Sequence, residues 1–327
     1  MWCMGATAAL DSDGFAVELD IHRRELTGYC YRMLGAGSEA EDAVQETFLR
    51  AWRARDRFAH RSTLKTWLYK IATNVCLDMP ERPQRRARPM DLVSPSTCET
   101  AVLNELPEYR WVQPIADANV LSGAGDPAEL AAQRDSVRLA FVAALQTLAP
   151  RQRAVLILRE VLHMSAAEVA ELLDSSVASV NSALQRARSS IASQPAVADE
   201  AMLDADDREL LTRYVDTFER YDIDSLVALL REDAVSAMPP HELWIQGPAE
   251  IHRWMLGPGR ECEGSRLLAT RANGCPAFGS YRIDPDGGWS AWSLQVLELK
   301  RGRIATIHNY LNTEILSEFG LPARLDA

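Results

Sequence analysis

Apolar residues recur at helical spacing in two short stretches that follow one another between Ser165 and Ile191. Ser165 and Glu168, three positions apart, form a capping box that starts the first helix. After a tight turn, a second helix is predicted with its apolar positions on one face: Val177, Val180, Leu184, Ala187 and Ile191. Its other face carries small, hydrogen-bonding side chains: Ser176, Ser179, Asn181, Ser182, Gln185, Arg186 and Arg188. The pattern predicts a helical pair whose second helix has a polar outer face.

This outer face is typical of a helix-turn-helix that lies in the major groove of DNA, because its side chains suit base edges and phosphates. An ordinary helical hairpin with a solvated face is the plainer alternative. Upstream, Leu148–Leu162 is an amphipathic helix with Pro150 in its first turn, and it runs directly into the capped pair. This context favours DNA binding by a helical unit of residues 127–194.

A second helical pattern covers residues 38–52, within a helical unit of residues 15–90. Ser38 and Glu41 are predicted to form another capping box. The apolar positions share one face, at Ala40, Val44, Phe48, Ala51 and Trp52. The opposite stripe is Asp42, Gln45, Glu46, Leu49 and Arg53. This stripe is either a solvated charged face or a surface that binds a partner protein.

Positive charge gathers after this stripe, although the chain of 327 residues has a net charge of −11. Between Arg50 and Met90, eleven Lys or Arg residues outnumber three acids, a balance of +8 that suits phosphate contacts. The candidates for contact with nucleic acid are Arg57, His60, Arg61, Lys65, Tyr69, Lys70 and Asn74. Trp67 shares a helical face with Leu64, Leu68 and Ile71, so we expect it to be buried. Tyr69 is then partly exposed and able to stack on an unpaired base.

These motifs resemble, in the expected order, parts of bacterial sigma factors. Residues 38–52 and 62–78 resemble region two of the extracytoplasmic-function class, and residues 148–188 resemble region four. The resemblance implies that the chain binds core RNA polymerase, at its clamp and flap regions, and promoter DNA. It assigns the stripe of residues 42–53 to the polymerase clamp helices and the basic set to the single-stranded minus-10 box. The polar face of residues 176–188 is assigned to the minus-35 box in duplex form.

A segment of linker composition joins the two helical units. Pro80–Pro89 is rich in proline and arginine, and successive prolines end the first unit. Residues 91–126 mix acids, proline and glycine with Tyr109, Trp111 and Val112, so we expect a flexible linker with one apolar patch. Ser193–Glu200 is expected to be a second, short linker.

From residue 204 to residue 327 the pattern changes to alternating apolar positions. Helices are predicted at Asp207–Tyr221, Ile223–Arg231 and Pro248–Leu256. Strands are predicted at Ala234–Met238, Ser265–Ala272, Ala277–Ile283, Ser290–Lys300 and Arg303–Leu311, with hairpin turns at Asp286–Gly288 and Arg301–Gly302. This order resembles the SnoaL-like cone, an α+β fold with a curved antiparallel sheet. Asn273–Tyr281 resembles a strand pair of the version fused to some of these sigma factors, so the expected fold is two all-α sigma domains followed by this cone.

A cone of this fold encloses a pocket, and its candidate lining residues are Trp244, Trp254, Tyr281, Trp292, His308 and Tyr310. Three functions stay open for the tail. A fused cyclase needs a histidine beside a carboxylate, which no spacing in the chain identifies; a ligand sensor uses the pocket for a small molecule; a packing role needs neither. We expect a regulatory tail without catalysis, and partial loss of activity when it is removed.

Composition limits the remaining classes. The hydrophobic fraction of 47% supports several packed domains, and no apolar run has the length of a membrane span. Six cysteines are scattered without a CxxC or Cys/His cluster, so we expect reduced thiols, no metal and no cofactor. The sequence predicts a cytoplasmic sigma factor that initiates transcription. The alternative is a one-component, ligand-sensing regulator, which has no need of the stripe at residues 42–53.

Overall fold

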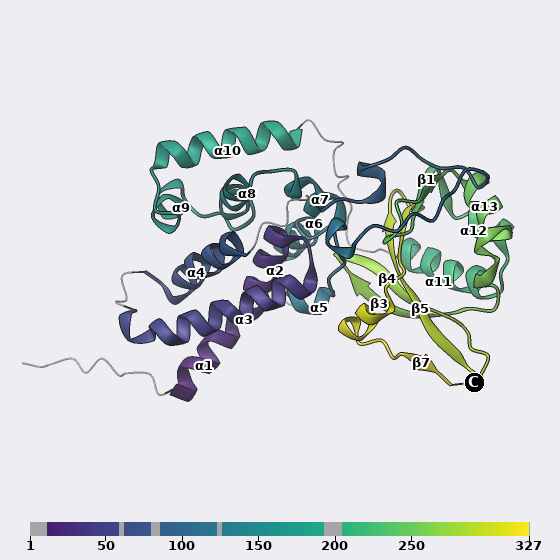
Figure 1. Cartoon of the computed structure of the whole chain (residues 1–327), viewed down its shortest axis with the longest axis horizontal. Helices are drawn as coiled ribbons and strands as arrows, with labels where there is room; N and C mark the ends of the chain where they lie inside the picture. Colours follow the sequence, from purple (N-terminus) through teal and green to yellow (C-terminus); the bar gives the residue numbers. More distant parts are fainter. Residues whose placement is uncertain (1–11, 59–61, 80–85, 123–125, 193–204, 327) are drawn as a thin grey trace, which may run out of the picture.

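The computed structural model describes residues 12–58, 62–79, 86–122, 126–192 and 205–326. Helices form the first part of the chain, and a sheet with its own helices forms the last part (Figure 1). The helices of the first unit are α1 Ser12–Ile21, α2 Arg23–Leu34, α3 Gly37–Ala54 and α4 Leu64–Asp78. α4 begins where the Thr63 hydroxyl accepts a hydrogen bond from the backbone N–H of Thr66. The capping box expected at Ser38 is wrong, since α3 begins after Ala36 and Glu41 accepts a hydrogen bond from Asn119 (3.2 Å).

The second unit contains α6 Pro127–Asp135, α7 Leu139–Gln146, α8 Pro150–Leu156, α9 Ala166–Leu172 and α10 Val177–Ala192. The capping box at Ser165 is confirmed: its hydroxyl accepts from the Glu168 N–H (3.2 Å), and the Glu168 carboxylate accepts from the Ser165 N–H (2.7 Å). α10 packs on α8 and α9 through Val180, Ala183, Leu184 and Ala187. Val177, expected on this buried face, is 45% exposed, because it is the first residue of α10 and precedes the turn that packs.

The C-terminal unit has the helices α11 Ala205–Glu219, α12 Ile223–Val227 and α13 Pro248–Leu256. Its strands are β1 Leu230–Ala237, β2 Trp244–Gln246, β3 Arg266–Ala272, β4 Cys275–Ile283, β5 Trp289–Leu299, β6 Ile304–Tyr310 and β7 Arg324–Leu325. In the described residues they form one sheet of seven strands in the order β2-β1-β6-β5-β4-β3, with β7 on β5. The sheet is mixed and not wholly antiparallel as expected, because β1 pairs with β6 in parallel across a long connection.

The two faces of this sheet belong to different cores. On one face, Phe278, Leu297 and Ile307 pack with α11, α12 and α13. On the other, Tyr281, Leu294 and Tyr310 join the core of the two helical units. Burying large side chains of this kind contributes about 1.5–3 kcal/mol each, so the sheet is joined to the helical units by apolar packing.

The segment between the helical units does not run free. Residues 86–116, here called the connecting segment, leave the first unit, cross the C-terminal unit and return (Figure 1). The Ser96 N–H donates to the Trp244 carbonyl (2.9 Å), and the Leu106 N–H donates to the Pro240 carbonyl (3.0 Å). α5 Asp117–Val120 follows it. The expectation of a flexible linker is wrong over this stretch, because backbone hydrogen bonds hold it on the C-terminal unit.

Several short helical turns complete the described chain: η1 Arg55–Arg57, η2 Pro89–Asp91, η3 Glu108–Arg110, the π-turn η4 Ile157–Val161, η5 Pro258–Cys262 and η6 Thr313–Phe319. Over the described ranges, none of the helices combines the length and the apolar character that crossing a membrane requires.

Candidate functional site

The stripe expected on residues 42–53 lies on the outer face of α3. Asp42, Gln45, Leu49 and Arg53 are exposed, and Glu46 is half-buried. Leu49 leaves 51% of its surface in solvent, although it lies among charged side chains. Arg50 Nε donates to the Glu46 carboxylate (2.7 Å), and Arg50 Nη1 reaches Asp78 of α4 (2.9 Å). An ordered polar stripe with an exposed leucine can bind a partner protein.

The candidate nucleic-acid residues on α4 keep polar groups at the surface. Lys65 forms an ion pair with Glu25 (2.6 Å), and Asn74 is exposed. Lys70 forms an ion pair with Asp174 (2.8 Å), in the turn between α9 and α10. His60 and Arg61 lie outside the described residues, as does the side chain of Arg57.

Tyr69 is not available to nucleic acid, which corrects the sequence prediction. It is 1% exposed, and its ring packs edge-on against Tyr29 of α2, with ring centroids 5.3 Å apart. Burial raises the pKa of its hydroxyl. Trp67, expected to be buried, is half-buried and packs against Phe58 (4.9 Å between centroids). The buried face of α4 includes Leu68, Tyr69 and Ala72, one position further along the helix than the predicted Trp67, Leu68 and Ile71. Because a helix turns by about 100° per residue, this shift exchanged the burial of the two aromatic rings.

The polar face of α10 is intact. All seven candidates, from Ser176 to Arg188, are exposed, and Val180 and Leu184 are buried behind them. The Ser176 hydroxyl accepts from the Ser179 N–H (3.2 Å), so Ser176 caps the helix. Arg188 forms an ion pair with Glu160 (2.6 Å). Arg186 and its neighbours therefore form a polar surface on a rigid helix, as contact with a DNA groove requires.

Comparison with known proteins identifies the family. Family models match residues 19–86 (Sigma-70 region 2), 138–191 (Sigma-70, region 4) and 211–307 (SnoaL-like domain). The ECF RNA polymerase sigma factor SigG of Mycobacterium tuberculosis is 43% identical over 320 residues, which cover 95% of this chain and 85% of that protein. The chain belongs to the extracytoplasmic-function (ECF) RNA polymerase sigma factors.

One further relative and one solved structure are similar to this chain. The ECF sigma factor SigW of Bacillus subtilis is 30% identical over 56% of this chain and 90% of its own length. The crystal structure of the M. tuberculosis ECF sigma factor SigJ shares the fold, with 22% identity, a TM-score of 0.59 and coverage of 94% of this chain and all of that one.

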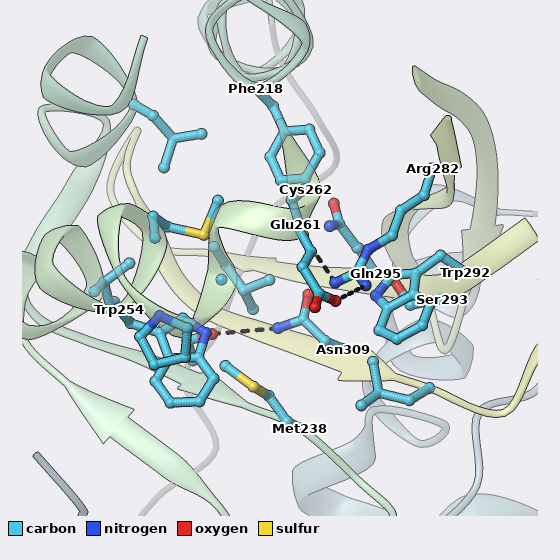
Figure 2. Close-up of a pocket in the computed structure, with 18 of the residues that line it drawn as sticks. Phe218, Met238, Trp254, Glu261, Cys262, Arg282, Trp292, Ser293, Gln295 and Asn309 are labelled. Carbon is cyan, nitrogen blue, oxygen red and sulfur yellow. Dashed lines mark hydrogen bonds and ion pairs between the residues drawn. The ribbon is translucent and has the colours of Figure 1, made fainter. Parts of the chain in front are cut away.

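The SnoaL-like domain of this ECF sigma factor encloses a cavity of about 260 Å³ (Figure 2). Helices α11 to α13 supply apolar walls: Tyr214, Phe218, Leu226, Ile251, Trp254 and Met255. The sheet supplies Ile307 and polar groups, and Met238 follows β1; the polar groups are Ser236, Arg282, Ser293, Gln295 and Asn309. Leu103 of the connecting segment also lines the cavity and is 60% exposed, so it lies at the opening. The cavity is apolar at one end and polar along the sheet.

Only part of the predicted pocket lines this cavity. Trp254 and Trp292 do so. On β6, Ile307 and Asn309 face the cavity, so His308 and Tyr310, one residue away, face the helical units. Tyr281 of β4 is on that outer face too, where its hydroxyl donates to the Pro322 carbonyl (2.9 Å). Trp244 turns to the connecting segment, and its Nε1 donates to the Val93 carbonyl (2.9 Å).

Sequence reasoning missed the polar cavity residues Arg282, Gln295 and Asn309. Strand alternation could have found them, because each shares a strand face with buried apolar residues. Within the described residues, no group of three or more His, Cys, Asp or Glu side chains is placed to hold a metal ion.

Asn273, in the turn between β3 and β4, joins three parts of this sigma factor. It is fully buried and has a φ of 55°, a left-handed conformation that asparagine tolerates. Its Nδ2 donates to the Tyr31 hydroxyl (2.6 Å) and to the Val137 carbonyl (2.7 Å), and its Oδ1 accepts from the Ile115 N–H (3.0 Å). Region two, region four and the connecting segment thus meet at one side chain.

A carboxylate that is mostly buried, with 23% of its side chain exposed, lies at the same junction. His308 Nε2 donates to Glu298 (3.0 Å) on the outer face of the sheet. Burial by itself raises the pKa of Glu298, but the His308 hydrogen bond and the charges of Arg88 and Arg138 lower it to about 2. Arg88 belongs to the connecting segment, and Arg138 precedes α7 of the second helical unit. The charge of Glu298 therefore favours the arrangement in which both parts lie against the sheet.

Proposed function

We propose that this chain joins core RNA polymerase and directs it to two-part promoters, as a transcription factor and not an enzyme. Asp42, Gln45, Glu46, Leu49 and Arg53 of α3 bind the polymerase clamp. The observation that supports this role most strongly is the exposed polar face of α10, held on a buried apolar core, in a chain of the ECF sigma family. Ser179, Asn181, Ser182, Gln185 and Arg186 read the minus-35 box, with Ser176 and Arg188 at the edges of the contact.

For the minus-10 box, the reading surface is α4 with the residues before it. Lys65, Lys70 and Asn74 contact phosphates and bases, together with Arg57, His60 and Arg61. Trp67 takes the stacking role first given to Tyr69, because it is the less buried of the two rings.

The compact arrangement is a resting state. Promoter positions −35 and −10 are separated by about 85 Å along B-form DNA, at roughly 3.4 Å per base pair. The α10 helix is about 24 Å long, and the turn before it contacts α4 through Lys70 and Asp174 (2.8 Å). Regions two and four must therefore separate before both boxes are bound, and the SnoaL-like tail opposes this separation through Asn273.

The tail is proposed to regulate the sigma domains, with a small molecule in its cavity as the signal. Its removal would take away the sheet face that carries Tyr281, Leu294 and Tyr310, and would leave the surface of the helical units that packs against this face open to water. This exposure explains why we expect partial loss of activity on complete removal. Weakening one polar contact is the cleaner test of regulation.

Transcription with purified core polymerase tests the whole proposal. The full chain should form a complex with core polymerase and start transcripts from promoters selected among genomic DNA fragments. Binding to DNA without binding to core polymerase would instead favour the one-component regulator. Failure of both would contradict the proposed function.

A further inference from the structure

Two polar groups in the cavity wall lack partners. Within the part of the chain that the structure describes, Nε of Arg282 and Nδ1 of His241 are buried without a hydrogen-bond partner. A buried donor left unpaired costs about 1–3 kcal/mol, more for a charged group. The cavity therefore presents one unpaired N–H of a cationic side chain to any occupant.

Arg282 is held in a fixed orientation. Its guanidinium lies over the Trp292 ring, 3.3 Å from the centroid, and its Nη1 forms an ion pair with Glu261 (2.6 Å; Figure 2). Glu261 also lines the cavity, but its side chain is 76% exposed, against 18% for Arg282, so water screens their ion pair. Arg282 Nη2 donates to the Cys262 sulfur (3.5 Å), and Nε is the guanidinium donor without a partner. The Nε–Nη edge of a guanidinium matches the two oxygens of a carboxylate.

The opposite walls of the cavity exclude a highly polar ligand. Tyr214, Phe218 and Trp254 are aromatic and buried, and they face the polar sheet residues across the cavity. A volume of about 260 Å³ is just below the range of roughly 300–1,000 Å³ typical of ligand pockets, so the occupant is compact.

We infer that this cavity binds a compact aromatic or alicyclic carboxylic acid. Its carboxylate pairs with the Nε edge of Arg282, and its ring system lies between Phe218 and Trp254. His241 provides a further polar contact. The inference deepens the ligand-dependent regulation in the proposed function and rests on it for the effect on transcription.

The ligand also bears on the connecting segment. Leu103 lines the cavity, and the next residues are fixed beside it: Asn104 Nδ2 donates to the Glu242 carboxylate (2.5 Å), and the Leu106 N–H donates to the Pro240 carbonyl (3.0 Å). A ligand that contacts Leu103 binds the chain more tightly when the connecting segment lies against the SnoaL-like domain. By linkage, the bound ligand stabilises that position of the segment.

Calorimetric titration of the full chain tests the ligand class. The probes are 2-naphthoate and its uncharged analogue 2-acetylnaphthalene. We expect 2-naphthoate to bind at least tenfold more tightly than the ketone, and Arg282→Met to abolish that preference without weakening ketone binding. Arg266→Met is the matched control, because Arg266 also lies over a tryptophan (Trp289, 5.0 Å) and pairs with Glu219 (3.4 Å) but does not line the cavity.

Equal affinity for the two probes, no binding of 2-naphthoate at millimolar concentration, or an unchanged preference in folded Arg282→Met would overturn the inference. If Arg282→Met does not fold, Arg282→Lys keeps the charge but lacks the two-donor edge, and it should bind 2-naphthoate several-fold more weakly with ketone binding unchanged. Hydrogen exchange at the Leu106 amide should slow when 2-naphthoate is bound. These measurements need no polymerase, so their failure is distinguishable from failure of the proposed function, which transcription tests separately.

Discussion

The Asn273 amide donates a hydrogen bond to the hydroxyl of Tyr31, 242 residues earlier, at 2.6 Å. The same Tyr31 hydroxyl donates to the Gln113 carbonyl of the connecting segment (2.7 Å). A hairpin of the SnoaL-like domain, a helix of region two and the connecting segment are thereby held in one chain of hydrogen bonds. Such chains stabilise one arrangement of the parts, because loss of any partner leaves the others unpaired.

Asn273→Gly should loosen this junction. Glycine adopts the left-handed backbone equally well, so the variant removes only the side-chain contacts with Tyr31, Val137 and Ile115. We expect the free energy of unfolding in urea to fall by about 3 kcal/mol, and transcription with core polymerase to rise because the compact state is less favoured. Arg301→Gly is the control, since Arg301 has a φ of 54° in an exposed turn. If Asn273→Gly is measurably less stable but transcription is unchanged, the proposed regulatory role of the tail is wrong.

Replacing Gln45 and Leu49 together with alanine should weaken binding to core polymerase. Both side chains are exposed on the outer face of α3, so their loss leaves the core of the first unit intact. We expect a cost of about 1–2 kcal/mol for each, measured as affinity for core polymerase. Leu256→Ala is matched in exposure, at 51%, and lies on α13 away from the stripe. The assignment of the stripe fails if the double variant and this control bind core polymerase alike.

Arg186→Ala tests the reading face of α10. Loss of a base-edge contact should weaken binding to the minus-35 duplex by about 1–3 kcal/mol and relax the preference at one base pair. Arg186→Lys distinguishes a base-edge contact from a phosphate contact, because lysine retains a phosphate contact but not a bidentate base contact. Arg213→Ala, on the exposed surface of α11, is the control. Identical binding of parent and Arg186→Ala across a panel of variant boxes would exclude Arg186 from the contact.

Asp174→Asn should free Lys70 for nucleic acid. The Lys70–Asp174 pair is solvent-exposed, with side chains 36% and 78% accessible, so it contributes at most about 1 kcal/mol. We expect binding of the full chain to a single-stranded minus-10 oligonucleotide to tighten up to about fivefold at low salt, and the effect to fade as salt rises. Fluorescence anisotropy measures this, with Asp216→Asn as the control, because Asp216 is an exposed acid paired with Arg220 (3.1 Å) on α11. Weaker binding by Asp174→Asn would contradict the assignment of Lys70.

Glu298→Gln should change how stability depends on pH. The pKa of Glu298 is lowered from 4.5 to about 2, so its charge stabilises the folded chain above pH 4.5 and this contribution disappears as the pH falls towards 2. The free energies of unfolding of the parent and the variant should differ by on the order of 2 kcal/mol at neutral pH, and this difference should shrink below pH 4.5. Unfolding by urea across this range measures the difference, and Glu314→Gln provides an exposed control. A constant difference between pH 6 and pH 2 would show that the Glu298 charge is not the cause.

The sequence by itself determined the local elements of this protein. The capping box at Ser165, the polar face of α10 and the hairpin at Arg301 follow from backbone hydrogen bonding and from side-chain period, which a few neighbouring residues define. For the same reason β3 and β4 lie almost where alternation placed them.

Only the tertiary structure decided which neighbours these elements meet. Tyr69 is buried because α4 packs against α2. His308 points away from the cavity because the cavity lies on the opposite face of the sheet. The connecting segment has linker composition, yet it is held by Trp244 and Pro240, more than a hundred residues later. Such pairings depend on contacts between distant parts of the chain, and no local period of apolar residues encodes them.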